Sequence, residues 1–194
     1  METVGKTVLV FAVVVATLGF PCEKMLVAAE APEVSEEQVK AAFLINFPKY
    51  VDWPSNAFAE ANSPIVVAVF GETALDKDLQ KMIKGKVIMG RPLLFRRVTA
   101  TEESTSGCHV LFIDAATVQR TPDILSKLNG ISVLTVGDSD NFLDSGGVIR
   151  FARRDRKVRL EVNLAAADQA HLKISSKLLS VADVVRGKSG EEKP

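Results

Sequence analysis

Apolar residues occur along the chain in short runs separated by polar and glycine-containing breaks. Residues 65–70 form a continuous apolar run, and further runs typical of strands follow at 93–98, 110–113 and 132–136. Short apolar runs bounded by turn residues are typical of strands buried on both faces of a parallel sheet. We therefore expect these segments to be strands of one mostly parallel sheet, with a short extended piece at 87–89.

Helical spacing of apolar residues appears at 34–51, 73–84 and 118–128. Ser35 is a suitable N-cap for the first helix, because its hydroxyl can accept a hydrogen bond from a free amide of the first turn. Pro48 must kink or end that helix, since proline has no N–H to donate. One side of the helix is expected to carry Val39, Ala42, Phe43, Asn46 and Tyr50.

The pattern changes towards the C-terminus. Residues 148–153 and 157–163 alternate between apolar and polar positions, which predicts an antiparallel hairpin, and helices are expected at 164–171 and 175–185. Strands that alternate with helices predict an α/β fold. We expect a mostly parallel sheet covered by helices on both faces, with an antiparallel C-terminal edge hairpin.

The first residues are typical of a secretory signal peptide. Lys6 precedes an apolar run at 8–20, which is shorter than the roughly 18 to 20 residues needed to cross a bilayer. The small residues of Ala29-Glu30-Ala31 suit a signal peptidase. We expect residues 1–31 to be removed, with a competing cleavage site after Ala29.

Cysteine usage is compatible with export. Cys22 would be lost with the signal peptide, which leaves Cys108 alone, so the mature monomer cannot form an internal disulfide. Acylation of Cys22 is not expected, because bulky Phe20 and Pro21 stand where lipoprotein processing requires small residues.

Length and charge predict one domain without a bias towards nucleic acid. The chain has 194 residues, with 24 basic and 24 acidic side chains, and cleavage after Ala29 removes two of each. The remaining residues, about 160, correspond to one ordinary domain. We expect a single domain at 32–186 and a disordered tail at 187–194.

The ends of the expected strands are the first places to look for chemistry, because α/β proteins bind ligands there. Asp114 and Asp138 each follow a strand and could hold Mg²⁺, but the first strand lacks an acidic pair, so capping roles are preferred. Walker, Gly-x-Gly-x-x-Gly and Gly-x-Ser-x-Gly motifs are absent. No catalytic residue, metal or cofactor is therefore expected.

Cys108 and His109 are neighbours on an expected strand and point to opposite faces, so packing is expected rather than a catalytic pair. His171 ends a predicted helix, where the helix dipole favours a cation, and a pocket role is the alternative. Trp53, the only tryptophan, either plugs the core under the first helix or anchors an interface.

The expected hairpin carries the strongest local charge cluster. These side chains either protect a solvated sheet edge or bind an anion or an acidic partner. The cluster comprises Arg150, Arg153, Arg154, Arg156, Lys157 and Arg159.

Several strings, taken together, resemble the YfiR family of periplasmic proteins. The first is VKAAFLINFPKYVDWP at 39–54. The others follow in family order and cover nearly all of the expected mature chain. They are GRPL at 90–93, GCHVLFI at 107–113, SVLTV at 132–136, GGVI at 146–149, VRLEVNLAA at 158–166 and ISSKLL at 174–179.

The resemblance implies an α/β regulator in the periplasm without enzymatic activity. The best-known member holds the inner-membrane diguanylate cyclase YfiN inactive by binding its periplasmic part, and the outer-membrane lipoprotein YfiB sequesters that member. By resemblance we expect repression of a membrane diguanylate cyclase, lower cyclic-di-GMP, a lipoprotein as a further partner, and a homodimer. Two departures from the family pattern are Pro48, in place of a small residue, and the lack of the cysteine pairs that some relatives use for redox sensing.

Partner contact is expected at Trp53, Arg153, Arg154 and Arg156. The alternative function is a periplasmic small-molecule-binding module feeding a membrane sensor, with Arg91 and His171 as anion contacts. An exported hydrolase is a third possibility, which would need an aspartate of the strand ends close to a histidine.

Overall fold

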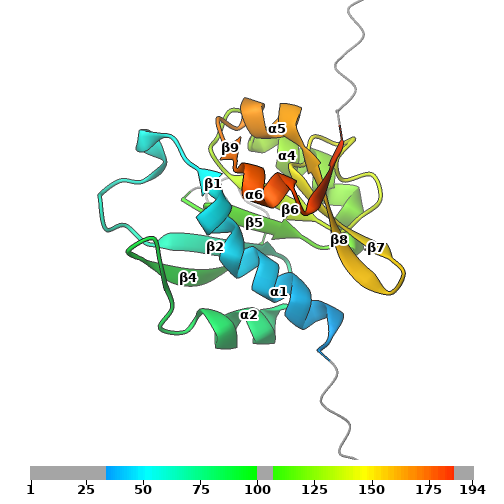
Figure 1. The fold of residues 1–194 in the computed structure, drawn as a ribbon, viewed down its shortest axis with the longest axis horizontal. Coiled ribbons are helices and arrows are strands. Elements are labelled where there is room, and N and C mark those ends of the chain that lie inside the picture. The colour runs from blue at the N-terminus through cyan, green and yellow to red at the C-terminus, as the bar shows by residue number, and fades with distance from the viewer. Residues whose placement is uncertain (1–33, 100–106, 186–194) are drawn as a thin grey trace, which may run out of the picture. The chain divides into compact units, whose positions relative to one another are not determined.

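The computed structural model describes residues 34–99 and 107–185. The predicted signal peptide at 1–31 and the predicted tail at 187–194 lie outside these residues. Within the described residues, an eight-stranded sheet has the strand order β10-β8-β7-β6-β5-β2-β4-β3 (Figure 1). Its strands are β2 Ile65–Phe70, β3 Val87–Ile88, β4 Arg91–Val98, β5 Val110–Ile113, β6 Leu134–Gly137, β7 Ile149–Arg154, β8 Lys157–Asn163 and β10 Ala182–Val185.

The sheet is mostly parallel. Strands β4, β2, β5, β6 and β7 are parallel neighbours in that order, whereas β3 and β8 pair antiparallel with β4 and β7. A separate antiparallel pair joins β1 Val51–Asp52 to β9 Lys173–Ile174. This pair brings the segment after the first helix next to the segment before the last helix.

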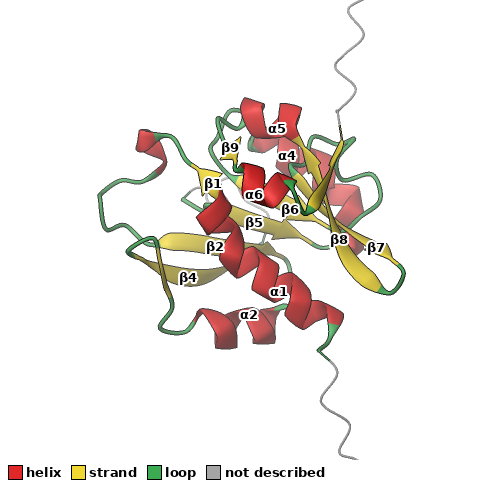
Figure 2. Ribbon diagram, in the orientation of Figure 1, coloured by secondary structure: helices red, strands yellow, loops and turns green. Residues whose placement is uncertain are grey.

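Helices cover both faces of the sheet (Figure 2). All residues of β2 are buried, and they alternate between two cores. The odd-numbered residues pack in the core beneath α1 Glu36–Asn46 and α2 Asp76–Ile83, and the even-numbered ones pack in the core beneath α4 Thr121–Lys127. The α/β fold class is confirmed.

Helix α1 begins as predicted and ends earlier. Ser35 forms a capping box with Gln38, and Glu36 lies in the first turn, where the helix dipole favours an acid. The α-helix stops at Asn46, and a 3₁₀ turn, η1 Phe47–Tyr50, contains Pro48. Proline is tolerated in the first turn of a new helix and not inside an old one, so Pro48 accounts for the change.

The side of α1 that is fully buried differs from the predicted one. Ala41, Leu44 and Ile45 are the buried residues of the helix, whereas the predicted side, with Phe43 and Tyr50, is half-buried. The remaining short elements are η2 Ser55–Ala57, η3 Ala115–Arg120, α5 Leu164–Gln169 and α6 Ser176–Leu179.

The predicted helix at 175–185 is wrong in its second half. Helix α6 ends at Leu179, and β10 then pairs in parallel with β8, from Ala182 opposite Leu160 to Val185 opposite Asn163. An available strand edge overrides a weak local helix preference. The β7-β8 hairpin is formed as predicted, and β10 lies outside it as the edge strand.

The hairpin turn holds two residues in the left-handed region. Asp155 has φ 52° and Arg156 has φ 58°, as a type I′ turn requires, and glycine is favoured at the second of these positions. Replacing Arg156 with glycine is expected to raise the free energy of unfolding by about 0.5 to 1 kcal/mol, because an L side chain is strained there. Urea denaturation measures the change. Lys157→Gly, within β8, should lower stability, and a destabilised Arg156→Gly protein would contradict the prediction.

Candidate binding site

A pocket of about 310 Å³ opens beside β1. Its wall combines the segment that follows α1 with the start of β2 and the β3-β4 turn, so three regions distant in sequence meet there. The pocket is mostly apolar, with Arg91 as its cationic side chain. Its lining residues are Val51, Asp52, Trp53, Pro54, Ser55, Phe58, Ile65, Met89 and Arg91.

Aromatic rings and a guanidinium group are stacked along one wall of the pocket. The Arg91 guanidinium carbon lies 3.8 Å from the centroid of the Phe58 ring. The His109 ring stacks on Phe58, with centroids 4.4 Å apart and an interplanar angle of 15°. Trp53 meets both rings edge-on, at 6.2 Å from Phe58 and 6.5 Å from His109. Such stacks hold a loop side chain in a defined place.

Arg91 is held in position by the loop before β2. One terminal nitrogen of its guanidinium donates to the Glu60 carbonyl at 3.0 Å and to the Ser63 carbonyl at 2.8 Å. Both acceptors are neutral backbone carbonyls, so these hydrogen bonds do not neutralise the positive charge of Arg91. Arg91 therefore contributes a fixed charge at an apolar pocket, as an anion contact requires.

Trp53 has a half-buried ring and a buried indole nitrogen. Among the described residues, its Nε1 has no hydrogen-bond partner. A buried N–H without a partner is costly, so such a donor favours a ligand or partner atom that accepts from it. Met89 adds an exposed apolar side chain, 67% accessible, at the mouth of the same pocket.

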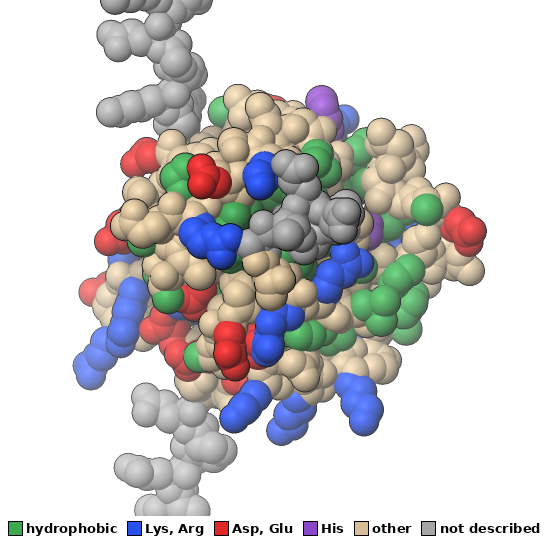
Figure 3. Space-filling model, turned by 180° about the vertical axis from the view of Figure 1, so that it is seen from behind, with side chains coloured by type: hydrophobic (Ala, Val, Ile, Leu, Met, Phe, Trp, Pro, Cys, Tyr) green, Lys and Arg blue, Asp and Glu red, His purple; other side chains and the backbone are tan. Residues whose placement is uncertain are grey.

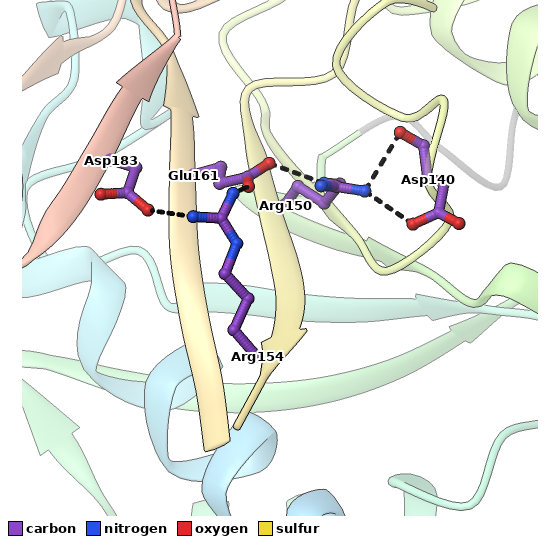
Figure 4. A network of polar contacts seen from close by, with 5 residues as sticks. All are labelled: Asp140, Arg150, Arg154, Glu161 and Asp183. Atoms are coloured by element: carbon purple, nitrogen blue, oxygen red, sulfur yellow. Dashed lines mark hydrogen bonds and ion pairs between the residues drawn. The ribbon is translucent and has the colours of Figure 1, made fainter. Parts of the chain in front are cut away.

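Two arginines of the hairpin bind the same buried carboxylate, that of Glu161 (Figure 4). Glu161 is 4% exposed and accepts from Nε of Arg150 at 2.8 Å and from a terminal nitrogen of Arg154 at 2.6 Å. Arg150 also reaches Asp140, and Arg154 reaches Asp183 on β10. The hydrogen bond with Glu161 is the main reason why the pKa of Arg150 is raised. Arg154, predicted as a contact residue, is thus largely engaged in joining β7, β8 and β10.

Arg153 and Arg156 point to the surface. Arg153 lies 3.5 Å from a Glu36 carboxylate oxygen at the start of α1, and its side chain remains 69% exposed. Arg156 is exposed in the hairpin turn. Figure 3 shows lysine and arginine side chains spread over the face opposite to that in Figure 1, with hydrophobic side chains between them.

His171 is separate from the pocket lining. It is exposed, has φ 56° and follows α5 just before β9. Since β9 pairs with β1, His171 and Trp53 flank the same two-stranded sheet from opposite ends of the sequence. The structure thus brings Trp53 and Arg91 into one pocket, and it leaves the hairpin arginines and His171 outside that pocket.

The aspartates at the strand ends act as caps. Asp138 accepts from Nζ of Lys40 at 2.8 Å and from the amide of Ala115 at 2.7 Å, and Asp114 accepts from the amide of Ala116 at 2.8 Å. His109 precedes β5 and Asp114 follows it, so a catalytic pair would have to span a strand. Within residues 34–99 and 107–185, no group of three or more His, Cys, Asp or Glu could hold a metal ion.

Cys108 lies in the core beneath α4, and burial raises the pKa of its thiol to about 11. A thiol reacts as the thiolate, so we expect Cys108 to react with a maleimide at least 100-fold more slowly in the folded protein than in urea. A protein beginning at residue 32 has this cysteine alone and suits the measurement. Equal rates in buffer and in urea would show that the thiol is accessible.

The chain is an α/β domain with a mostly apolar pocket, and its described polar side chains mainly hold the structure together. The chain belongs to the YfiR/HmsC-like family, whose model matches residues 37–183. No curated protein matches the chain. Family membership indicates a regulator of cyclic-di-GMP signalling in the periplasm, from a group of regulatory, non-catalytic proteins. In the described part of the chain, no helix is long and apolar enough to cross a membrane.

Two residues of the aromatic stack were not predicted: Phe58, which lines the pocket, and His109, which packs on Phe58 behind the lining. Phe58 lies in a loop without periodicity, and His109 was expected only to pack. Both acquire their roles from contacts across about 50 residues of sequence, which no local pattern indicates. Trp53 and Arg91 could be singled out earlier because one is the only tryptophan and the other precedes a strand in a family motif.

Proposed function

We propose that this protein binds the periplasmic domain of a membrane diguanylate cyclase and represses it, which lowers cyclic-di-GMP. Family membership supports the signalling context. The pocket beside β1 is the main support for where the cyclase would bind. There, among the described residues, Trp53 has a buried N–H without a partner, and Met89 is exposed. Tryptophan and arginine at an apolar pocket are typical of residues that dominate binding energy.

The proposal is tested first in cells. Deleting the gene should raise cyclic-di-GMP, and crosslinking of whole cells should recover an inner-membrane cyclase. An unchanged level together with no recovered membrane protein contradicts repression.

The location of binding is tested with variants. Trp53→Ala should weaken binding to the recovered cyclase domain by at least about 30-fold, as expected for a central aromatic residue. Ile131→Ala is the control, because Ile131 is an exposed apolar residue that precedes β6 and lies outside the pocket lining. Arg153→Ala and Arg156→Ala test the hairpin as a rim contact, with Lys77→Ala on α2 as control. Unchanged binding of the Trp53→Ala protein would show that the interface lies elsewhere on the surface.

The second candidate function is small-molecule binding, which the volume of the pocket and the fixed charge of Arg91 favour. A ligand with an apolar body and an acceptor or anionic group would fit this lining. Native mass spectrometry of the purified mature protein distinguishes the two. A retained small molecule that is lost in Arg91→Ala supports a binding module, and an empty protein that binds the cyclase supports the regulator alone.

We also propose, from the family, a homodimer and an outer-membrane lipoprotein as a further partner. Sedimentation of the mature protein tests the first. Competition between the lipoprotein and the cyclase for the purified protein tests the second.

A further inference from the structure

His109 occupies a junction between the sheet and the wall of the pocket. It immediately precedes β5, and its backbone amide donates to the Val66 carbonyl at 2.9 Å. Its imidazole makes two more hydrogen bonds, with the Val66 amide at 3.1 Å and with the Ala57 carbonyl at 3.1 Å. The side chain therefore continues the β2-β5 ladder and ties the loop at Ala57 and Phe58 to the sheet.

The two partners define the protonation state of the ring. The Val66 amide is a donor, so Nδ1 must accept and cannot carry a proton. The Ala57 carbonyl is an acceptor, so Nε2 must carry the proton. Only the neutral imidazole, protonated at Nε2, satisfies both bonds.

Protonation would place two donors against each other. A proton on Nδ1 would face the Val66 N–H, and the ring would have to move away from β2. Ala57 is bonded to the ring and Phe58 is stacked on it, so both would move with it. The new charge would also be repelled by Arg91, on the other side of Phe58, and by Arg96 of β4. The neighbouring Cys108 stays neutral, because burial raises the pKa of its thiol to about 11.

We propose that His109 is a pH-sensitive latch, whose neutral ring holds the 55–58 loop against the sheet and whose protonation displaces this loop and changes the shape of the Trp53 pocket. The latch itself follows from the hydrogen bonds, and only its effect on partner binding rests on the proposed function. In the periplasm, a fall in pH would then change the shape of the Trp53 pocket through this latch.

The direction of the pH dependence follows from burial. Burial lowers the pKa of His109, and the positive charges of Arg91 and Arg96 lower it further, against the opposing effect of the Ala57 carbonyl. The unfolded chain therefore takes up the proton before the folded one. The contribution of His109 to stability is complete above pH 6.5, its ordinary pKa, and is lost as pH falls below that value.

The experiment uses the only tryptophan as a reporter. Trp53 lies 6.5 Å from His109, and the chain has one other histidine, His171. We expect NMR titration of the mature protein to give a pKa for His109 below 6.5, and Trp53 fluorescence and its quenching by acrylamide to change with the same midpoint. Hydrogen exchange at the Val66 amide should rise across the same range.

Variants separate the latch from general acid effects. The side-chain amide that His109→Asn introduces can still accept from the Val66 N–H and cannot titrate, so the fluorescence change should disappear, whereas His171→Asn should retain it. A change that persists in His109→Asn, or a His109 that titrates without altering Trp53 quenching or Val66 exchange, overturns the latch. If His109→Asn does not fold, the NMR and exchange measurements on the unmodified protein decide the question. If the protein proves not to bind a cyclase, the proposed function fails, but the NMR, fluorescence and exchange measurements still test the latch.

Discussion

Glu161→Ala is expected to lower the free energy of unfolding by about 3 to 5 kcal/mol, the cost of removing one partner from a buried ion pair. The Glu161 side chain is 6% exposed and is bonded to both Arg150 and Arg154. Without it, Arg150, which is itself 16% exposed, keeps only the exposed Asp140 as a partner. Urea denaturation followed by circular dichroism measures the loss.

Controls assign this effect to the buried carboxylate. Glu161→Gln keeps the shape and one acceptor, so we expect a smaller loss. Asp140→Asn removes the charge of a fully exposed partner and should cost much less than Glu161→Ala, since exposed ion pairs contribute little. A Glu161→Ala protein as stable as the Asp140→Asn protein would mean that the network carries no net stabilisation.

Phe142→Ala is expected to lower the free energy of unfolding by about 3 to 5 kcal/mol, because it opens a cavity in the core beneath α4. The ring of Phe142 is 0% exposed and lies between Gly137 and Gly147. A Cβ at either glycine would overlap ring atoms of Phe142. Gly147→Ala should therefore also destabilise, by about 1 to 3 kcal/mol, through overpacking.

The double variant tests the physical reason. With Phe142→Ala in place, Gly147→Ala has room for its methyl group, so its cost should disappear and the coupling between the two sites should exceed about 1 kcal/mol. If the two losses are additive in the same urea denaturation, the position requires glycine for its backbone conformation and not because the Phe142 ring occupies the space of a Cβ.

The residues of the candidate site differ in how clearly the sequence indicates them. Trp53 is recognisable as the only tryptophan and Arg91 by the motif around it, but that both line one pocket depends on the β3-β4 turn lying beside β1. His109 is an ordinary histidine in the sequence. Its role as a hydrogen-bond junction depends on Val66 and Ala57, which the fold alone brings to it.

The hairpin arginines illustrate the same limit. In sequence, Arg150, Arg153, Arg154 and Arg156 look alike, as members of one basic cluster. Strand alternation and register place Arg150 opposite Glu161, and β10 brings Asp183 to Arg154. Arg150 and Arg154 are thereby paired with Glu161, although Arg154 remains 57% exposed. Arg153 pairs with Glu36, and Arg156 is exposed in the turn.

By itself, the sequence determined the buried strands, the capped start of α1, the hairpin and the family, because hydrophobic period, capping residues and motif order are local properties. The tertiary structure decided that residues 182–185 form a strand, that Pro48 starts a 3₁₀ turn, and which side chains share the pocket. Those outcomes depend on a free strand edge and on contacts between distant segments, whose free energies are absent from any single stretch of the chain.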